Sequence, residues 1–162
     1  MTHTPITLLQ AHWDGELPVK VEAIAHAAGI SVDRSFGSIA GQYSGSIARD
    51  DDGHTTISID ITEARVRQRF TIAHEIGHWA LGHLNDKKRC FRDGPAEFSS
   101  NATDSEEREA NNFAAQLLMP ETLIRWAIEK KGIESIPALA NLFDVSKVAM
   151  TYRLKNLGFI DG

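Results

Sequence analysis

Apolar and polar residues in the first part of the chain follow patterns that predict one helix and then a small sheet. Between residues 18 and 28 the apolar positions recur at helical spacing, and Gly29 follows as a helix stop. The β-like segments come next, at residues 30–32, 42–50 and 54–61. The last of these alternates apolar and polar residues with the period of a half-buried strand, and the Asp-Asp-Asp-Gly sequence before it predicts a hairpin turn.

From Thr62 onward the spacing becomes helical and predicts mostly α-structure. Helices are expected from Thr62 to about Gly82, from Thr103 to Met119, at about 121–131, and on either side of residues 144–146. The polar segment at residues 84–102 is expected to be a loop. This order of elements predicts an α+β fold, with a main domain at residues 1–131 and a helical tail at 132–162 packed on it.

Composition narrows the class of protein further. The 162 residues include 42% apolar and 24% charged residues, which is typical of a globular domain. A net charge of -5 argues against a surface built wholly for nucleic acid, and the single cysteine, Cys90, excludes a disulfide framework and a four-cysteine zinc site. No stretch approaches the ~18 apolar residues of a membrane span, and the N-terminal sequence lacks a signal-peptide pattern. We therefore expect a cytoplasmic protein that makes no membrane contact.

Residues 74–78, His-Glu-Ile-Gly-His, match the pattern H-E-x-x-H inside a predicted helix with apolar flanks. Side chains at positions i and i+4 of a helix point about 40° apart, so His74 and His78 project from one face with Glu75 beside them. Two neutral imidazoles suit Zn²⁺, which can bring the pKa of a bound water near ~7. A carboxylate beside that water can act as general base during attack on a peptide carbonyl. The motif thus predicts a zinc site.

Such a site needs a third protein ligand. His83 comes one residue too early for the longer pattern H-E-x-x-H-x-x-G-x-x-H, and it is expected to be a helix-end histidine. In the predicted helix at 103–119, Glu107 and Asn111 share a stripe between core and solvent, whereas Glu109 falls on the solvent side. Glu107 is therefore a candidate ligand, with Asn111 hydrogen-bonded to another ligand. Alternatively, Glu107 only stabilises the positive N-terminus of its helix, and the helix phase leaves both interpretations open.

The segments RQRFTIAHEIGHWALGH and EREANNFAAQLLMP together resemble the ImmA/IrrE family of metallo-endopeptidases, over roughly residues 29–120. The resemblance implies a zincin-like fold and the cleavage of regulatory proteins, often helix-turn-helix repressors of mobile elements or stress genes. It also implies one catalytic centre, composed of three zinc ligands and a general base: His74, His78, Glu107 and Glu75.

The tail and the basic segments carry further candidate roles. Residues 139–158 have a pattern typical of a helix-turn-helix, but the net charge of the tail is too low to favour DNA contact over a scaffold or substrate-docking role. Two basic segments bracket the motif, at residues 65–69 and 87–92. A candidate nucleic-acid patch in the second consists of Lys87, Lys88, Arg89 and Arg92. The alternative for both segments is an ordinary solvated surface.

Cys90 lies among those basic residues, which favour the thiolate form that binds zinc. A loop that folded back over the motif could place the Cys90 sulfur as an inhibitory fourth zinc ligand and exclude the attacking water. Single-stranded DNA or another polyanion that bound the loop would then act as an activator. The alternative is a cysteine without a role in the site.

Together these patterns predict a zinc-dependent endopeptidase that cleaves a regulatory protein, with zinc-bound water as nucleophile and Glu75 as general base. One alternative is a DNA-associated regulator that contains zinc and cleaves nothing. Another is a toxin-type or antitoxin-type partner that acts by complex formation. Glu75 favours the peptidase, because a purely structural zinc site needs no base. The strand near residues 44–49 is a further candidate, as an edge on which an extended peptide could pair, and the equal alternative is an ordinary hairpin strand.

Overall fold

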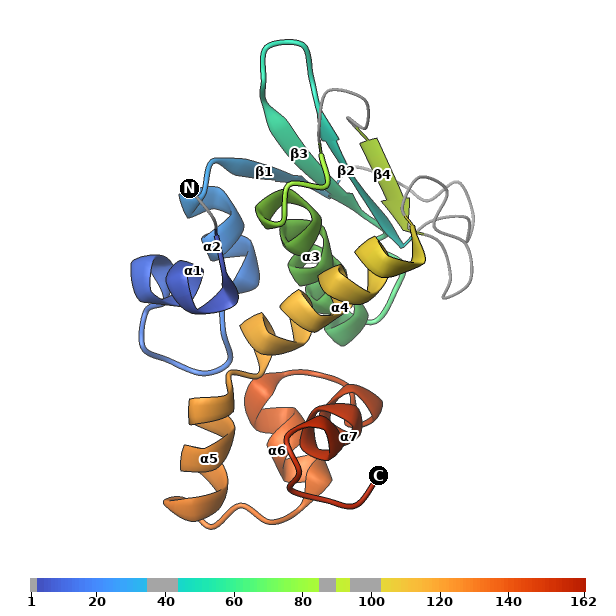
Figure 1. The fold of residues 1–162 in the computed structure, drawn as a ribbon. Helices are drawn as coiled ribbons and strands as arrows, with labels where there is room; N and C mark the ends of the chain where they lie inside the picture. Colours follow the sequence, from blue (N-terminus) through green and yellow to red (C-terminus); the bar gives the residue numbers. More distant parts are fainter. Residues whose placement is uncertain (1–2, 35–43, 85–89, 94–102) are drawn as a thin grey trace.

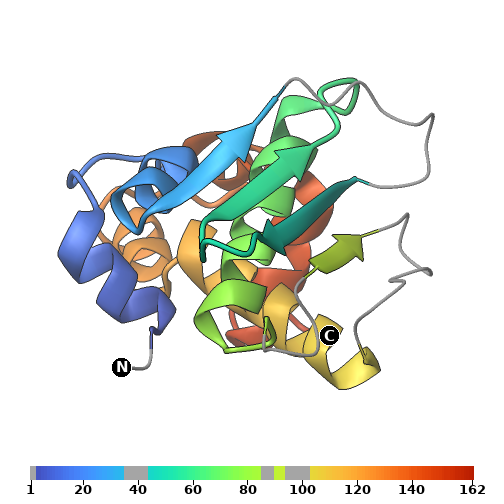
Figure 2. The same cartoon turned by 90° about the horizontal axis from the view of Figure 1, so that it is seen from above.

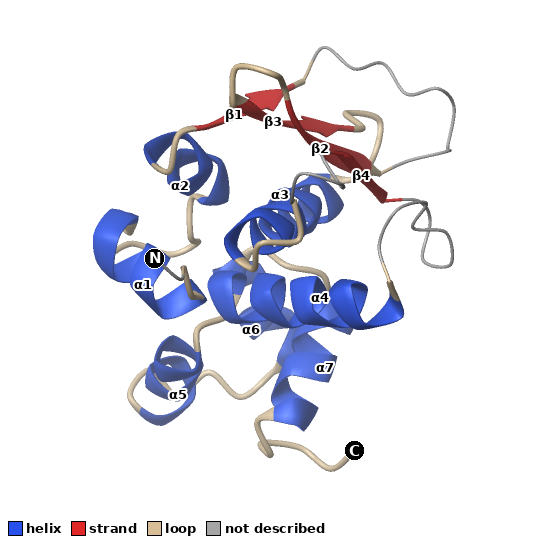
Figure 3. Ribbon diagram, turned by 45° about the horizontal axis from the view of Figure 1, so that its top comes forward, coloured by secondary structure: helices blue, strands red, loops and turns tan. Residues whose placement is uncertain are grey.

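The computed structural model describes residues 3–34, 44–84, 90–93 and 103–162. The elements along the chain are α1 (Pro5–His12), α2 (Val21–Ala27), β1 (Ile30–Asp33), β2 (Gly45–Arg49), β3 (Thr55–Ile59), α3 (Arg65–Ala80), β4 (Cys90–Asp93), α4 (Asp104–Leu118), α5 (Glu121–Glu129), α6 (Ile136–Phe143) and α7 (Lys147–Asn156). The strands form one layer and the helices pack beneath it, with α3 between the sheet and α4 (Figures 1 and 3). The predicted α+β fold is confirmed.

The sheet has the strand order β1-β3-β2-β4, with β1 parallel to β3 and the other pairs antiparallel (Figure 2). The alternation predicted for β3 is present, because Ile57 and Ile59 are fully buried while Ser58 between them is only half-buried. The predicted hairpin turn is also present. The Asp50 N–H donates to the His54 carbonyl over 2.9 Å, and Gly53 adopts a φ of 84° that suits glycine.

The strand β4 lies inside the segment that the sequence predicts to be a loop. It pairs antiparallel with β2, with Cys90 opposite Ala48 and Asp93 opposite Gly45. Its polar local sequence carries no clear strand signal, and the pairing comes from the open N–H and C=O groups of β2, which are distant along the chain. The expectation that β2 offers a free edge for a peptide is therefore wrong, because β4 covers that edge.

Helix α1 is absent from the sequence prediction, although its start carries helix signals. The Thr4 hydroxyl accepts the Thr7 N–H over 3.1 Å, the Thr4 N–H donates to the Thr7 hydroxyl over 2.8 Å, and Pro5 occupies the first turn. Only a narrow apolar stripe on this helix is buried, so its periodicity is weak. None of the helices in the described parts of the chain has the length and apolar character that a bilayer-spanning segment needs.

The α6–α7 corner is bound to α3 by a buried arginine. The side chain of Arg69 is 14% exposed, and its guanidinium donates to the carbonyls of Asp144 over 3.0 Å and of Val19 over 2.8 Å. Arg65 also pairs with the Asp144 carboxylate. Arg65 and Arg69, from the basic segment at residues 65–69, therefore lie within α3 and bind the tail. The division of the chain at residues 131 and 132 stays a prediction.

Candidate metal centre

Helix α3 supplies two buried imidazoles that point the same way. His74 is 5% exposed and His78 is fully buried, and their Nε2 atoms lie 3.1 Å apart. The apolar residues around the motif pack this part of α3 between the sheet and α4. The two imidazole rings are buried because they lie on this packed part of the helix. Buried imidazoles require partners, and an intramolecular hydrogen bond or a metal ion provides one.

Helix α4 brings a carboxylate to both rings. Glu107 Oε1 lies 2.9 Å from His78 Nε2, and Glu107 Oε2 lies 3.3 Å from His74 Nε2. One potential ligand atom each from His74, His78 and Glu107 lies within 4.8 Å of the other two. The helix phase behind this placement is as predicted, because Ala110 and Phe113 are buried while Glu107 is half-buried.

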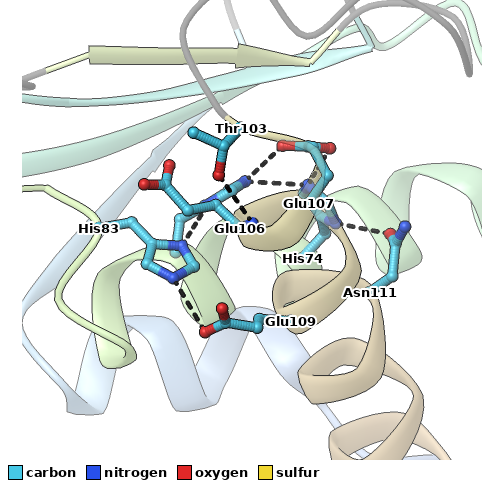
Figure 4. Close-up of polar contacts among 8 residues, drawn as sticks. His74, His83, Thr103, Glu106, Glu107, Glu109 and Asn111 are labelled. Atoms are coloured by element: carbon cyan, nitrogen blue, oxygen red, sulfur yellow. Dashed lines mark hydrogen bonds and ion pairs between the residues drawn. The ribbon is translucent and has the colours of Figure 1, made fainter.

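Asn111, one turn beyond Glu107, fixes the orientation of His74. Its Oδ1 lies 2.8 Å from His74 Nδ1 (Figure 4). An amide oxygen only accepts, so His74 Nδ1 carries the proton and donates, and the lone pair is on Nε2, which faces Glu107 and His78. Metal-binding histidines usually show this arrangement. Asn111 therefore makes the contact that its place on the stripe predicts.

The close approach of α3 and α4 depends on Gly77. A Cβ atom at this position would lie 3.1 Å from Phe113 Cβ and 3.2 Å from both the Cα and the carbonyl oxygen of Ala110. Two of these neighbours are backbone atoms of α4, which can move only with the helix. Gly77 thus sets the distance at which Glu107 reaches His78.

We expect Gly77→Ala to destabilise the protein, although alanine in a helix interior is about 1 kcal/mol more favourable than glycine in intrinsic helix propensity. Overpacking against the α4 backbone costs about 1–3 kcal/mol and moves Glu107 away from the imidazoles. Urea denaturation of the metal-free protein and zinc titration measure the two effects. Gly77→Ser, with one more atom in the same space, should lose more of both. A Gly77→Ala protein with wild-type stability and zinc affinity would contradict this role.

The surroundings of His78 favour its neutral form, and those of Glu75 leave its carboxylate without a partner in the described part of the chain. Burial lowers the pKa of His78 below the ordinary value of an imidazole, and the hydrogen bond with Glu107 acts in the opposite direction. A neutral imidazole is the form that binds a metal. Glu75 is fully buried, and both of its carboxylate oxygens lack a hydrogen-bond partner among the residues that the structure describes. A carboxylate in such a place needs a water, a cation or a substrate group beside it.

These residues fit a catalytic zinc ion by their donor chemistry. Two imidazole nitrogens and one carboxylate oxygen are a donor set that Zn²⁺ accepts, and they leave a coordination position for water or substrate. His83 is not part of this set. Its Nδ1 lies 2.8 Å from His78 Nδ1, on the far side of that ring from the Nε2 cluster.

The remaining sequence candidates lie beyond what the structure describes. Lys87, Lys88 and Arg89 are outside the described residues. Cys90 and Arg92 lie in β4, whose backbone is described and whose side chains are not. The inhibitory sulfur ligand and the nucleic-acid patch therefore stay predictions, with one change: Cys90 belongs to a strand and not to a loop.

A pocket lies between the first half of α3 and the start of α7. Its volume is about 220 Å³, and its lining consists of Val66, Arg67, Phe70, Val145, Ser146, Val148 and Ala149. The ring centres of Phe70, which lines the pocket, and of His74 are 6.5 Å apart. Arg67, Phe70 and His74 share one face of α3, because their spacing returns to nearly the same direction. Sequence patterns could not reveal this pocket, since α7 forms its other wall.

Comparison with known proteins adds a family to this geometry. Residues 25–155 match the family described as the IrrE N-terminal-like domain, Peptidase M78. The chain belongs to this family. The resemblance indicated by the two motif segments is thereby confirmed, and the name of the family is that of a peptidase family.

Two known proteins are similar to this chain, one in sequence and one in fold. Over 106 residues the chain is 34% identical to the Radiation response metalloprotease IrrE of Deinococcus radiodurans, a match that covers 64% of the chain and 32% of that relative. The chain thus aligns with about a third of the relative's length. The solved structure of a Mycobacterium tuberculosis transcriptional regulator aligns with a TM-score of 0.52 at 17% identity, over 93% of this chain and 40% of that one. At that identity the likeness concerns the fold.

Proposed function

We propose that this chain is a zinc-dependent endopeptidase with a zincin-like fold, in which His74, His78 and Glu107 bind Zn²⁺ and Glu75 is the general base. The observation that carries the proposal is the buried Glu75 carboxylate without a partner among the described residues, at the position on α3 that directly follows His74 of the His-His-Glu cluster. A site that bound a metal only for stability would not need to bury a carboxylate there. Membership in a metallopeptidase family supports the same conclusion.

The bound metal would lower the pKa of a water and polarise the peptide carbonyl. The chain's own residues do the rest. Glu75 accepts the proton of the attacking water on a carboxylate oxygen and then delivers it to the amine nitrogen that leaves. Because Glu75 is fully buried, its carboxylate is poorly solvated and a proton transfer to it is favoured over that to an exposed carboxylate. Asn111 holds His74 in the tautomer that directs its Nε2 lone pair to the metal.

The pocket next to His74 is proposed to accept an apolar side chain that flanks the scissile bond. An extended peptide advances about 3.3 Å per residue, so a residue within about two positions of the scissile bond spans the 6.5 Å between the ring centres of Phe70 and His74. The lining is apolar apart from Arg67 and Ser146, and Val148 leaves one side open to solvent. Among peptide side chains, an aliphatic or aromatic one fits this lining best.

The proposed substrate is a regulatory protein in the cytoplasm, of the helix-turn-helix repressor type. The tail at 132–162, with α6 and α7 in a helix-turn-helix-like order, would act in docking it. Contacts between the tail and α3 support this docking role. Arg65 and Arg69 bind the Asp144 carboxylate, and Arg69 also binds the Asp144 carbonyl, so these two arginines serve the packing of the tail and not the binding of a nucleic acid.

Incubation of the protein with a helix-turn-helix repressor as substrate tests the function and the pocket together. Zinc-loaded protein should cut it and chelator-treated protein should not, and mass spectrometry should map an apolar residue beside the cut bond. Ala149→Leu, which fills the pocket, should lower kcat/KM about 10-fold or more without loss of zinc. The matched control is Ala27→Leu, at an exposed position of α2. Cuts without side-chain preference, equal in both variants, would refute the pocket assignment.

A further inference from the structure

The chain returns to the metal centre directly after α3 ends. The His83 N–H donates to the His78 carbonyl over 3.0 Å, and the Gly82 N–H donates to the Trp79 carbonyl over 3.2 Å. This pair of bonds, with Gly82 at a φ of 76°, is a Schellman motif. The motif brings the first residue after the glycine back over the helix, and an apolar contact often forms between that residue and the one five positions earlier. Here the contact is between two imidazoles, those of His83 and His78.

His83 links the interior of the site to the surface. Its ring is 8% exposed, and its Nδ1 lies 2.8 Å from His78 Nδ1. Its other nitrogen, Nε2, lies 3.4 Å from Glu109 Oε2 (Figure 4). The second oxygen of Glu109 accepts from the Ser105 hydroxyl over 3.2 Å. The resulting row of groups runs from the solvent side of α4 through His83 to His78.

The protonation states along this row follow from simple rules. Two ring nitrogens 2.8 Å apart form a hydrogen bond only when one carries a proton and the other a lone pair. His78 Nε2 faces His74 and Glu107, so a metal there needs the Nε2 lone pair and leaves the proton of the neutral ring on Nδ1. His83 Nδ1 must then be the acceptor. The proton of His83 is left on Nε2, where the Glu109 carboxylate accepts it.

We propose that His83 is a positioning residue for the metal centre: its Nδ1 accepts the proton of His78 Nδ1 and so holds the Nε2 lone pair of His78 toward the metal, while Glu109 fixes the tautomer of His83. The inference rests on the proposed metal site. It gives His78 the same support that Asn111 gives His74, through an acceptor that comes from beyond the end of α3 and not from α4. A ligand role for His83 itself does not fit, because its ring faces the nitrogen of His78 that points away from the cluster.

Zinc affinity of the full chain, measured by competition with a chelating dye, tests this role. His83→Phe keeps a flat ring but removes the acceptor, and zinc affinity should fall about 10- to 100-fold, the usual cost of losing such a partner. His83→Asn should recover most of the affinity, because Asn Oδ1 and His Nδ1 are both attached one bond beyond Cγ and both accept. Glu109→Ala should cause a smaller loss than His83→Phe, since Glu109 is 53% exposed and water replaces it.

The matched control is His26→Phe, the same exchange at an exposed histidine of α2, which should leave zinc affinity unchanged. The rise in Tm on adding zinc should shrink in His83→Phe in step with the lost affinity. Wild-type zinc affinity in His83→Phe, or an equal loss in His83→Asn and His83→Phe, would overturn the proposal. A wild-type chain that binds no zinc would overturn the metal site as well, so the two failures can be told apart.

A second measurement needs no substitution at His83. In zinc-loaded wild-type protein, nitrogen-15 NMR of the imidazoles should find His83 protonated on Nε2 and bare on Nδ1, and His78 protonated on Nδ1. A His83 ring that carries its proton on Nδ1 would overturn the proposal even if every variant folded poorly.

Discussion

Glu75→Gln should abolish peptide cleavage while zinc stays bound. The substitution keeps the size of the side chain and removes the group that accepts the proton, and loss of a positioned general base lowers rates by about 10²–10⁴-fold. The zinc ligands are untouched, since His74 Nε2, His78 Nε2 and the Glu107 carboxylate make the cluster without Glu75. Mass spectrometry of a helix-turn-helix repressor incubated with each protein measures cleavage, and elemental analysis measures the bound metal.

The burial of Glu75 makes this variant informative about stability too. Its carboxylate oxygens are buried without a hydrogen-bond partner among the described residues, so exchange for a neutral amide should not lower the free energy of unfolding of the metal-free protein. A catalytic loss without a loss of stability cannot be attributed to misfolding. Glu129→Gln, at an exposed site on α5, is the matched control and should behave as wild type. Equal cleavage by Glu75→Gln and wild type would exclude Glu75 as the base, whereas absence of cleavage by zinc-loaded wild type would favour the alternative of a zinc-containing regulator that cleaves nothing.

The parts of the site that depend on helix periodicity could be predicted from the sequence. Positions four apart share a helix face, so His74 and His78 had to point together, and the phase of α4 had to direct Glu107 and Asn111 the same way. The structure adds what periodicity cannot state, namely that these two faces meet. Gly77 is the residue that lets them meet, and its role depends on which α4 atoms lie opposite.

The parts that were not predicted depend on contacts between distant segments or on the geometry at helix ends. The pairing of β4 with β2 joins residues more than forty positions apart, and the burial of Arg69 depends on Asp144 in the tail. His83 is the instructive case, because its signal is present in the sequence. A glycine at Gly82 after a helix predicts a Schellman motif, and that motif predicts that the next side chain returns to the helix. Counting residues for a metal-ligand pattern tests only direct ligation, and it misses a histidine that supports a ligand.

Glu107→Ala should cause the largest loss of zinc of any substitution on α4. The variant removes the carboxylate that approaches both imidazoles and leaves only two nitrogen ligands, which hold a divalent ion poorly. Zinc affinity should fall by more than the ~10- to 100-fold that follows loss of a partner outside the ligand set. Dye competition under the conditions used for His83→Phe measures this directly.

Glu109→Ala is the matched control for Glu107→Ala, because both carboxylates start from the first half of α4 and only their helix phase differs. Glu109 contacts His83 Nε2, whereas Glu107 contacts the Nε2 atoms of His74 and His78, so loss of Glu109 should weaken zinc binding far less. The alternative for Glu107, that it only stabilises the positive end of its helix, predicts something else. A helix-terminus charge contributes about 0.3–1 kcal/mol and its removal would lower the stability of the metal-free protein with little effect on zinc. Zinc affinity that falls more in Glu109→Ala than in Glu107→Ala would show that the ligand has been assigned to the wrong face of α4.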